Sequence, residues 1–169
     1  INFSTGVRFA GVDKTKHGVV AKLEDGQTFA ADLMLVAVGR GSATRNQGFE
    51  EAGLEFDGEL IKVNENLQTN LANVYAVGDI VRGPQLAHKG FQEGIFVAEH
   101  IKGLNPRVID VTAIPRVVYS EPEVASVGLN ESAAKEKYGA DQLRTVQYDL
   151  AGNGKSQILR TAGFIKLIA

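Results

Sequence analysis

One aspartate, Asp79, stands where a carboxylate could hold a ligand. It follows Gly78 at the end of a short apolar run, residues 74–77, which reads Val-Tyr-Ala-Val after a polar turn. Four apolar residues bounded by turn formers are typical of a buried strand, and ligands of open α/β sheets bind beyond the carboxyl ends of strands. Gly78 has no Cβ, so the backbone there can approach another group closely. Asp79 is thus placed to accept hydrogen bonds from a sugar-like hydroxyl, although spacing alone favours a plain turn residue.

A second set of residues could supply backbone donors. After a Gly-Pro pair at 83–84, apolar residues recur at steps of three and four from Ala87 to Ile101, which predicts a helix that ends before Gly103. A helix that starts near Leu86 presents unpaired N–H groups and a partial positive charge at its N-terminus. This end favours an electron-rich acceptor that carries negative charge.

His88 lies in the first turn of this predicted helix and titrates near neutrality, so a catalytic role is one interpretation. Such a position is more typical of a packing or hydrogen-bonding residue. The other histidines, His17 and His100, share no ligand spacing with it, and the chain has no cysteine. We therefore expect no metal, and the lack of cysteine excludes disulfides, thiolate metal sites and a cysteine nucleophile.

Length and composition are those of a folded chain, and they argue against a nucleic-acid surface and a membrane span. The 169 residues are 44% hydrophobic, and they can hold one domain or parts of more than one. The formal net charge of −2 argues against a nucleic-acid surface. No apolar run approaches the roughly 20 residues that span a bilayer. No basic region followed by an apolar core opens the chain, so no signal peptide is visible and we expect a cytoplasmic location.

Residues 1–40 are predicted to form the end of an α/β domain. Strand-like runs cover residues 7–12, 19–23 and 28–31, with a hairpin turn at 24–27. Residues 33–38 are continuously apolar, which is typical of a strand covered on both faces. Gly39 follows, and it is either a plain strand-end glycine or part of a site. No G-x-G-x-x-G fingerprint occurs in this region.

Residues 111–169 change character and predict an α+β domain with an antiparallel sheet. The predicted elements are strands at 114–119 and 124–127, a helix capped by Asn130 and ended by Gly139, the segment 142–150, a Gly-rich loop, and strands at 156–159 and 164–168. The loop sequence Gly-Asn-Gly-Lys-Ser at 152–156 is similar to a phosphate loop. We interpret it as a hairpin loop, because Asp149 replaces the required glycine and no helix is expected to follow.

Four strings together resemble the FAD-dependent pyridine nucleotide–disulfide oxidoreductases. They are residues 32–40, 69–79, 84–90 and 114–128. The second string is similar to the family's second flavin motif, T-x-x-x-x-(V/I)-(Y/F)-A-x-G-D, whose aspartate binds the ribityl chain of FAD. The chain departs from the family at Ala72, often proline, at Gly90, usually alanine, and at 41–43, where x-P-N is usual. Gly90 weakens the helix by about 1 kcal/mol.

The resemblance implies two cofactors and the residues that contact them. FAD would meet Asp79, Gln85, Leu86, Ala87 and His88, and NAD would lie near Val7 and Gly39. The helix start would face the pyrimidine end of the isoalloxazine. His88 would line this pocket largely by its backbone.

The resemblance also implies the domain organisation. Residues 1–40 would be the C-terminal part of the NAD-binding domain, residues 41–110 the C-terminal part of the FAD-binding domain, and residues 111–169 the N-terminal part of an interface domain. We expect a segment of a longer flavoenzyme that stops partway through the interface domain. The redox cysteine pair and both nucleotide fingerprints would precede it and the His-Glu base would follow it, so no catalytic residue is expected here.

Within the family, the strings most resemble the bacterial dihydrolipoamide dehydrogenases. Mercuric reductase, glutathione reductase and soluble transhydrogenase are the related alternatives. This resemblance implies a homodimer that serves the lipoyl-bearing subunits of 2-oxoacid dehydrogenase complexes. An alternative of another class is a complete small binding or assembly protein that keeps these folds without redox work.

Overall fold

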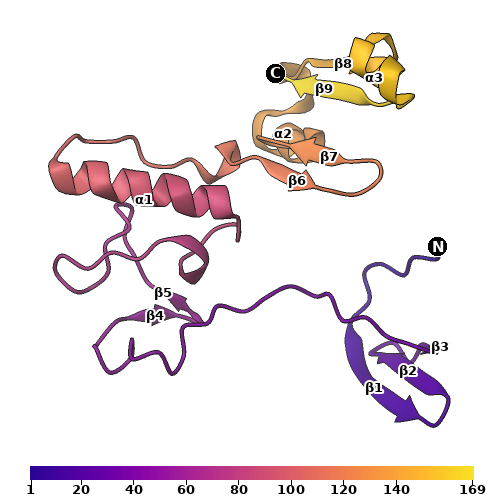
Figure 1. Cartoon of the computed structure of the whole chain (residues 1–169), viewed down its shortest axis with the longest axis horizontal. Coiled ribbons are helices and arrows are strands. Elements are labelled where there is room, and N and C mark those ends of the chain that lie inside the picture. The colour runs from indigo at the N-terminus through magenta and orange to yellow at the C-terminus, as the bar shows by residue number, and fades with distance from the viewer. The chain divides into compact units, whose positions relative to one another are not determined.

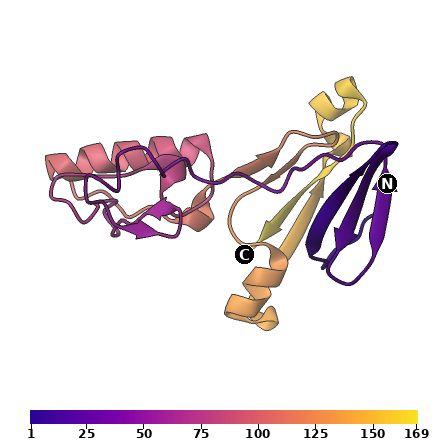
Figure 2. The same ribbon diagram turned by 90° about the horizontal axis from the view of Figure 1, so that it is seen from below.

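The first of two compact units, residues 1–41, is a small antiparallel sheet. The computed structural model describes all 169 residues and divides after Gly41. The unit contains β1 (Phe9–Thr15), β2 (Gly18–Leu23) and β3 (Thr28–Ala31), which lie side by side in that order (Figure 1, Figure 2). The predicted hairpin between the last two strands is confirmed. Gly18 has φ +143°, and a Cβ there would lie 2.3 Å from the Ala31 carbonyl oxygen, so the first hairpin requires glycine.

The predicted strand at residues 33–38 does not form. No strand covers this run, and Leu33, Leu35 and Val38 are 88%, 89% and 91% exposed. A strand of this kind needs neighbours that satisfy its backbone groups and layers that cover both faces. The sheet of this unit contains β1, β2 and β3 alone, and none of them pairs with the run. The prediction is therefore wrong for this chain, because the run has no pairing partner.

The second unit, residues 42–169, carries the remaining elements. Its strands and helices are β4 (Phe56–Asp57), β5 (Leu60–Ile61), α1 (Ala87–Lys102), β6 (Arg116–Val118), β7 (Val124–Ser126), α2 (Glu131–Tyr138), β8 (Thr145–Asp149), α3 (Gly154–Leu159) and β9 (Phe164–Ile168). Short 3₁₀ turns lie at Gly78–Ile80 (η1), Val111–Ala113, Ala140–Gln142 and Leu150–Gly152. The strands form three antiparallel pairs, β4-β5, β6-β7 and β8-β9. None of the helices is both long and apolar enough to cross a membrane.

A small apolar cluster supports the segment that carries Asp79. Its buried members are Ile61, Ala76 and Val81, which lie on both sides of η1. The predicted strand at 74–77 is reduced to one isolated bridge between Gln68 and Tyr75. Left-handed residues at Asn73 (φ +62°) and Gly78 (φ +81°) bend the chain before and after the run, and no strand pairs with it. Asp79 therefore lies in a 3₁₀ turn and not directly at a strand end.

Helix α1 forms where the sequence predicts it, but its apolar stripe is uncovered. It ends at Gly103, whose left-handed backbone (φ +78°) closes the last turn. Phe91, Ile95 and Ile101 of the stripe are 72%, 52% and 65% exposed. The buried positions of the helix are Lys89, Glu93 and Phe96. The face that packs against the chain is thus the one that carries a charged pair.

The C-terminal elements mostly follow the prediction. Asn130 caps α2 by accepting a hydrogen bond from the Ala133 N–H at 2.9 Å. The predicted strand at 156–159 is instead helix α3, because the Asn153 side chain accepts from two N–H groups that follow it. The expectation that no helix follows the Gly-rich loop is therefore wrong. Asp149 at the position of the required glycine still argues against a phosphate loop.

Glu131, in the first turn of α2, joins two lysines. Lys135 donates from one helical turn along at 2.6 Å, and Lys166 of β9 donates to the other carboxylate oxygen. These hydrogen bonds, with Lys135 first, lower the pKa of the Glu131 carboxyl from 4.5 to about 2. The ion pairs tie the start of α2 to β9.

We expect Glu131→Gln to lower the melting temperature of the intact protein slightly at pH 7, because exposed ion pairs contribute little. The difference from wild type should shrink as pH falls from 4.5 towards 2, since the stabilisation from a lowered folded pKa is complete above the unfolded value and is lost as pH falls through the folded value. Thermal melts across this pH range measure the effect. Glu136→Gln, an exposed change on the same helix, is the control. A difference that stays constant with pH would contradict the ion-pair account.

Candidate functional site

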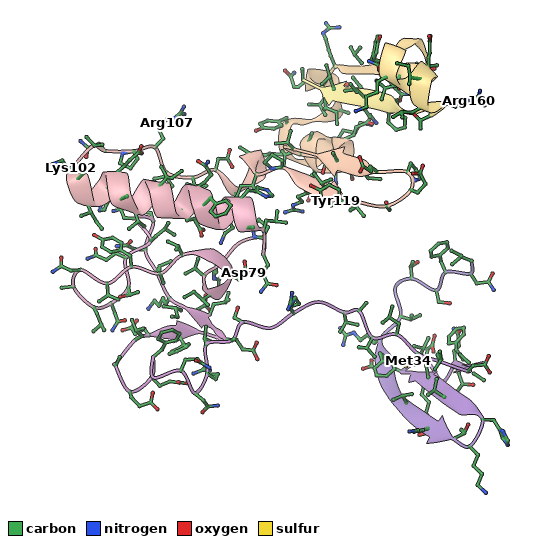
Figure 3. The ribbon with its side chains drawn as sticks, in the orientation of Figure 1. Met34, Asp79, Lys102, Arg107, Tyr119 and Arg160 are labelled. Carbon is green, nitrogen blue, oxygen red and sulfur yellow. The ribbon has the colours of Figure 1, made fainter.

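Asp79 presents a free carboxylate at the surface of the second unit. It is exposed and lies in the middle of η1, and its side chain makes no hydrogen bond or ion pair within the chain. The turn itself is fixed, because the Ser42 hydroxyl donates to the main-chain carbonyl of Asp79 at 2.6 Å. Figure 3 shows Asp79 near the end of α1 that lies opposite to Lys102, the last helical residue. The structure thus offers a carboxylate with its acceptor capacity unused.

The start of α1 offers backbone donors. Leu86 precedes the helix with an extended backbone and provides no side-chain cap, and the first turn contains no acidic residue. The N–H groups of Lys89 and Gly90 bond to the Leu86 carbonyl, whereas those of Ala87 and His88 have no partner within the chain. Two free N–H groups at a helix start attract an acceptor that carries negative charge. This is the chemistry that the sequence predicts here.

A buried ion pair joins these two features. Lys89 Nζ lies 2.8 Å from Glu93 Oε1, and the side chains are 1% and 5% exposed. Glu93 Oε2 accepts from the Gly78 N–H at 2.6 Å, and Lys89 Nζ donates to the Gly78 carbonyl at 3.0 Å. Both polar backbone groups of Gly78, the residue before Asp79, are therefore held by side chains of α1.

Glycines make room for this arrangement. A Cβ at Gly83 would lie 2.5 Å from Lys89 Cε, so the lysine stem passes directly over the Gly83 backbone. A Cβ at Gly90 would lie 3.4 Å from the Gly78 Cα, which is ordinary contact. Gly90 therefore faces the η1 turn, and alanine, usual in the resembled family, would just fit.

His88 uses its side chain for the chain's own structure. The ring Nε2 lies 2.7 Å from the Pro115 carbonyl oxygen, a hydrogen bond that links α1 to the segment before β6. The ring is thus engaged with the Pro115 carbonyl, and the part of His88 available at the helix start is its N–H. Gln85 is exposed just before the helix. The turn η1, which carries Asp79, packs on α1, the helix that begins after Leu86 with Ala87 and His88.

The two residues predicted to lie near NAD belong to the first unit. Val7 precedes β1 and Gly39 follows the apolar run, and both are exposed. Gly39 has φ +111°, a backbone conformation that favours glycine. Their contact with NAD stays a prediction.

One hollow of the second unit does not include Asp79 in its lining. It has a volume of about 690 Å³, and its lining includes His88, Arg107, Asp110 and Tyr119. The hydroxyl and N–H of Thr112 bond to Asp110 and hold the pKa of that carboxyl below its ordinary value. The polar groups of the hollow thus serve local turns in part, and we assign it no ligand. No group of three or more histidine, aspartate or glutamate side chains is placed to hold a metal ion.

Sequence reasoning missed Ser42, Lys89 and Glu93. One signal was available for the pair, because Lys89, Glu93 and Phe96 follow one another at steps of four and three on one helix face. The stronger apolar stripe on another face concealed it. No sequence pattern marks Ser42, whose contact with Asp79 spans 37 residues.

Comparison with known proteins shows the family. The model of the pyridine nucleotide-disulphide oxidoreductases matches residues 1–94, and the model of the dimerisation domain of the same family matches residues 114–169. The first match covers more than half of the chain, so the chain belongs to this family.

Among its relatives are dihydrolipoyl dehydrogenases. One from Bacillus subtilis (strain 168) is 41% identical over 173 residues, which cover 99% of this chain and 36% of the relative. One from Geobacillus stearothermophilus is 40% identical over 94% of this chain and 34% of the relative. The solved structure of LpdA from Mycobacterium tuberculosis matches 96% of this chain and 36% of its own at 25% identity, with a TM-score of 0.81. The chain therefore spans about a third of the length of the proteins that it resembles.

A flavoprotein disulfide reductase, RclA of Escherichia coli, is also similar. Its structure matches 94% of this chain and 36% of its own at 25% identity, with a TM-score of 0.77. The mixed arrangement of strands and helices in this chain is thus that of the FAD- and NAD-binding segments and of the dimerisation domain.

Proposed function

We propose that the intact protein reoxidises dihydrolipoamide, passing electrons through a redox disulfide and FAD to NAD⁺. The observation that carries this proposal is the similarity of nearly the whole chain to dihydrolipoyl dehydrogenases at up to 41% identity. The products would be lipoamide, NADH and a proton. The chain itself has no cysteine, so the redox disulfide would be supplied by another part of the protein.

The residues of this chain fit the flavin at one place. The Asp79 carboxylate, which has no partner in the chain, would accept from a ribityl hydroxyl. The free N–H groups of Ala87 and His88 would donate to the pyrimidine end of the ring, next to Gln85 and Leu86. FAD, when bound, would take up the electron pair and release it to NAD⁺. Donors fixed at a helix start favour the charge that builds up there.

The remaining assignments follow the same proposal. NAD would lie near Val7 and Gly39, in a part of the NAD-binding domain that ends near residue 40. Residues 41–110 would belong to the FAD-binding domain and residues 111–169 to the interface domain of a homodimer, in keeping with the match to a dimerisation domain. Lipoyl-bearing subunits of 2-oxoacid dehydrogenase complexes would be the partners. A cytoplasmic location fits the bacterial relatives.

A substrate panel tests this function on the purified intact protein. The reactions are NAD⁺ reduction by dihydrolipoamide, NADPH oxidation by glutathione disulfide or mercuric ion, and hydride exchange between NADPH and NAD⁺. We expect dihydrolipoamide with NAD⁺ to give the highest kcat/KM. Faster turnover of another pair would reassign the protein within the family. No turnover of any pair would favour the non-catalytic binding or assembly protein.

A further inference from the structure

Lys89 and Glu93 form a buried clamp that the proposed flavin chemistry does not use. We propose that they are positioning residues for FAD, which hold the Gly78 peptide groups and so fix Asp79 relative to the first turn of α1. This inference rests on the proposed flavin site and adds to it the residues that set its geometry.

Lys89 and Glu93 bind both polar backbone groups of a single residue, Gly78. Glu93 accepts from the Gly78 N–H at 2.6 Å, and Lys89 donates to the Gly78 carbonyl at 3.0 Å. The two side chains also bond to each other at 2.8 Å, so three polar contacts close a ring around Gly78. The Gly78 backbone has φ +81°, a conformation that residues with a side chain rarely adopt. The orientation of the η1 turn is thereby determined on the N-terminal side of Asp79.

Stability alone does not explain a charged pair at this place. Both side chains are almost fully buried, and no buried side-chain polar atom of the chain lacks a partner. Replacing a buried ion pair by apolar residues of similar size is often neutral or stabilising. The order of lysine before glutamate is also the less favourable one along a helix. What an apolar pair could not provide is one donor and one acceptor directed at the same backbone residue.

The clamp connects the two features that would contact FAD by a short path. Gly78 is the neighbour of Asp79, and Lys89 is the neighbour of His88, whose N–H is free. A ligand that uses the Asp79 carboxylate and the helix N–H groups together binds best when their separation is fixed beforehand. The clamp fixes it, because a shift of η1 along α1 would break both of its contacts to Gly78.

The test measures FAD affinity in the intact protein after removal of its flavin. Fluorescence titration of the apoprotein with FAD compares wild type with Lys89→Met and Glu93→Gln. We expect the dissociation constant to rise at least tenfold in each variant. Glu99→Gln, at an exposed position of the same helix, should leave it unchanged. Gly83→Ala is a further variant, which disturbs the clamp but keeps both charges. It does so because the added Cβ would press on the Lys89 stem.

A double variant separates an effect on FAD positioning from an effect on the stability of the fold. Lys89→Met leaves the Glu93 charge buried without its partner and should lower the melting temperature strongly. Lys89→Met with Glu93→Gln removes that charge, so we expect much of the melting temperature to return while the dissociation constant for FAD stays raised. Recovery of both properties together would overturn the positioning role.

A double-mutant cycle with Asp79→Ala tests whether the clamp acts through Asp79. We expect Glu93→Gln to weaken FAD binding much less in the Asp79→Ala background than in wild type. If Glu93→Gln raises the dissociation constant for FAD by the same factor in both backgrounds, the inference is overturned. If Asp79→Ala weakens FAD binding and the clamp variants do not, the inference fails and the proposed function stands. If the wild-type protein binds no FAD, both fail.

Discussion

Replacing Asp79 by alanine in the intact protein is expected to raise the dissociation constant for FAD by about ten- to a hundredfold. A hydrogen bond to a charged group contributes about 1.5–3 kcal/mol, which corresponds to that range of affinity. The effect should be direct, because the Asp79 side chain supports nothing else in the chain. The η1 turn keeps its Ser42 and clamp contacts, which use backbone groups of Gly78 and Asp79 that alanine retains.

Flavin content after dialysis and titration of the apoprotein measure this effect. Asp57→Ala is a matched control in the same unit, since Asp57 pairs with Arg82 at the surface at 2.5 Å. We expect the control to keep its FAD and to melt close to wild type. Unchanged FAD content in the Asp79→Ala variant would refute the assignment of Asp79 to the ribityl chain.

The 169-residue chain on its own is expected to associate and to show no NAD-linked turnover of dihydrolipoamide. The apolar run 33–38 and the α1 stripe of Phe91, Ile95 and Ile101 are largely exposed. The two-stranded pairs β6-β7 and β8-β9 leave strand edges open. Exposed apolar patches and unpaired edges favour association. Turnover should be absent because the chain has no cysteine to form a redox disulfide.

Sedimentation velocity of the purified chain measures its association, and an assay with dihydrolipoamide and NAD⁺ measures turnover. The intact protein at the same concentration is the control, and it should sediment as one species and turn over. A monodisperse monomer with a cooperative melt would contradict the first part and favour a self-sufficient binding or assembly protein. Measurable turnover would contradict the second part.

The sequence predicts best those elements whose signals are local. The turn at 24–27, the capping residue Asn130 and the terminating Gly103 each act within a few residues, and the structure has the hairpin and both helices in place. Capping and turn chemistry are satisfied by neighbours in the chain, so they do not depend on distant packing. The prediction that Asp79 contacts a ligand rests on a signal of the same kind, a short string around a turn.

The wrong predictions concern elements that depend on distant partners or on a cap that was overlooked. The runs 33–38 and 74–77 have the composition of strands, but a strand needs a neighbour, and one run has none while the other has a single bridge. Residues 156–159 contain strand-forming side chains, but the Asn153 cap directs them into α3. The clamp was missed because periodicity weighs apolar residues, and here a charged pair occupies the buried face.

The most direct test of the flavin site is a crystal structure of the intact protein with bound FAD. We expect an Asp79 carboxylate oxygen within hydrogen-bonding distance, about 2.6–3.2 Å, of a ribityl hydroxyl, and the Ala87 or His88 N–H at a similar distance from a carbonyl oxygen of the pyrimidine. The Lys89–Glu93 clamp should still hold Gly78 in that structure. FAD bound elsewhere, with Asp79 and the start of α1 facing solvent, would contradict the account.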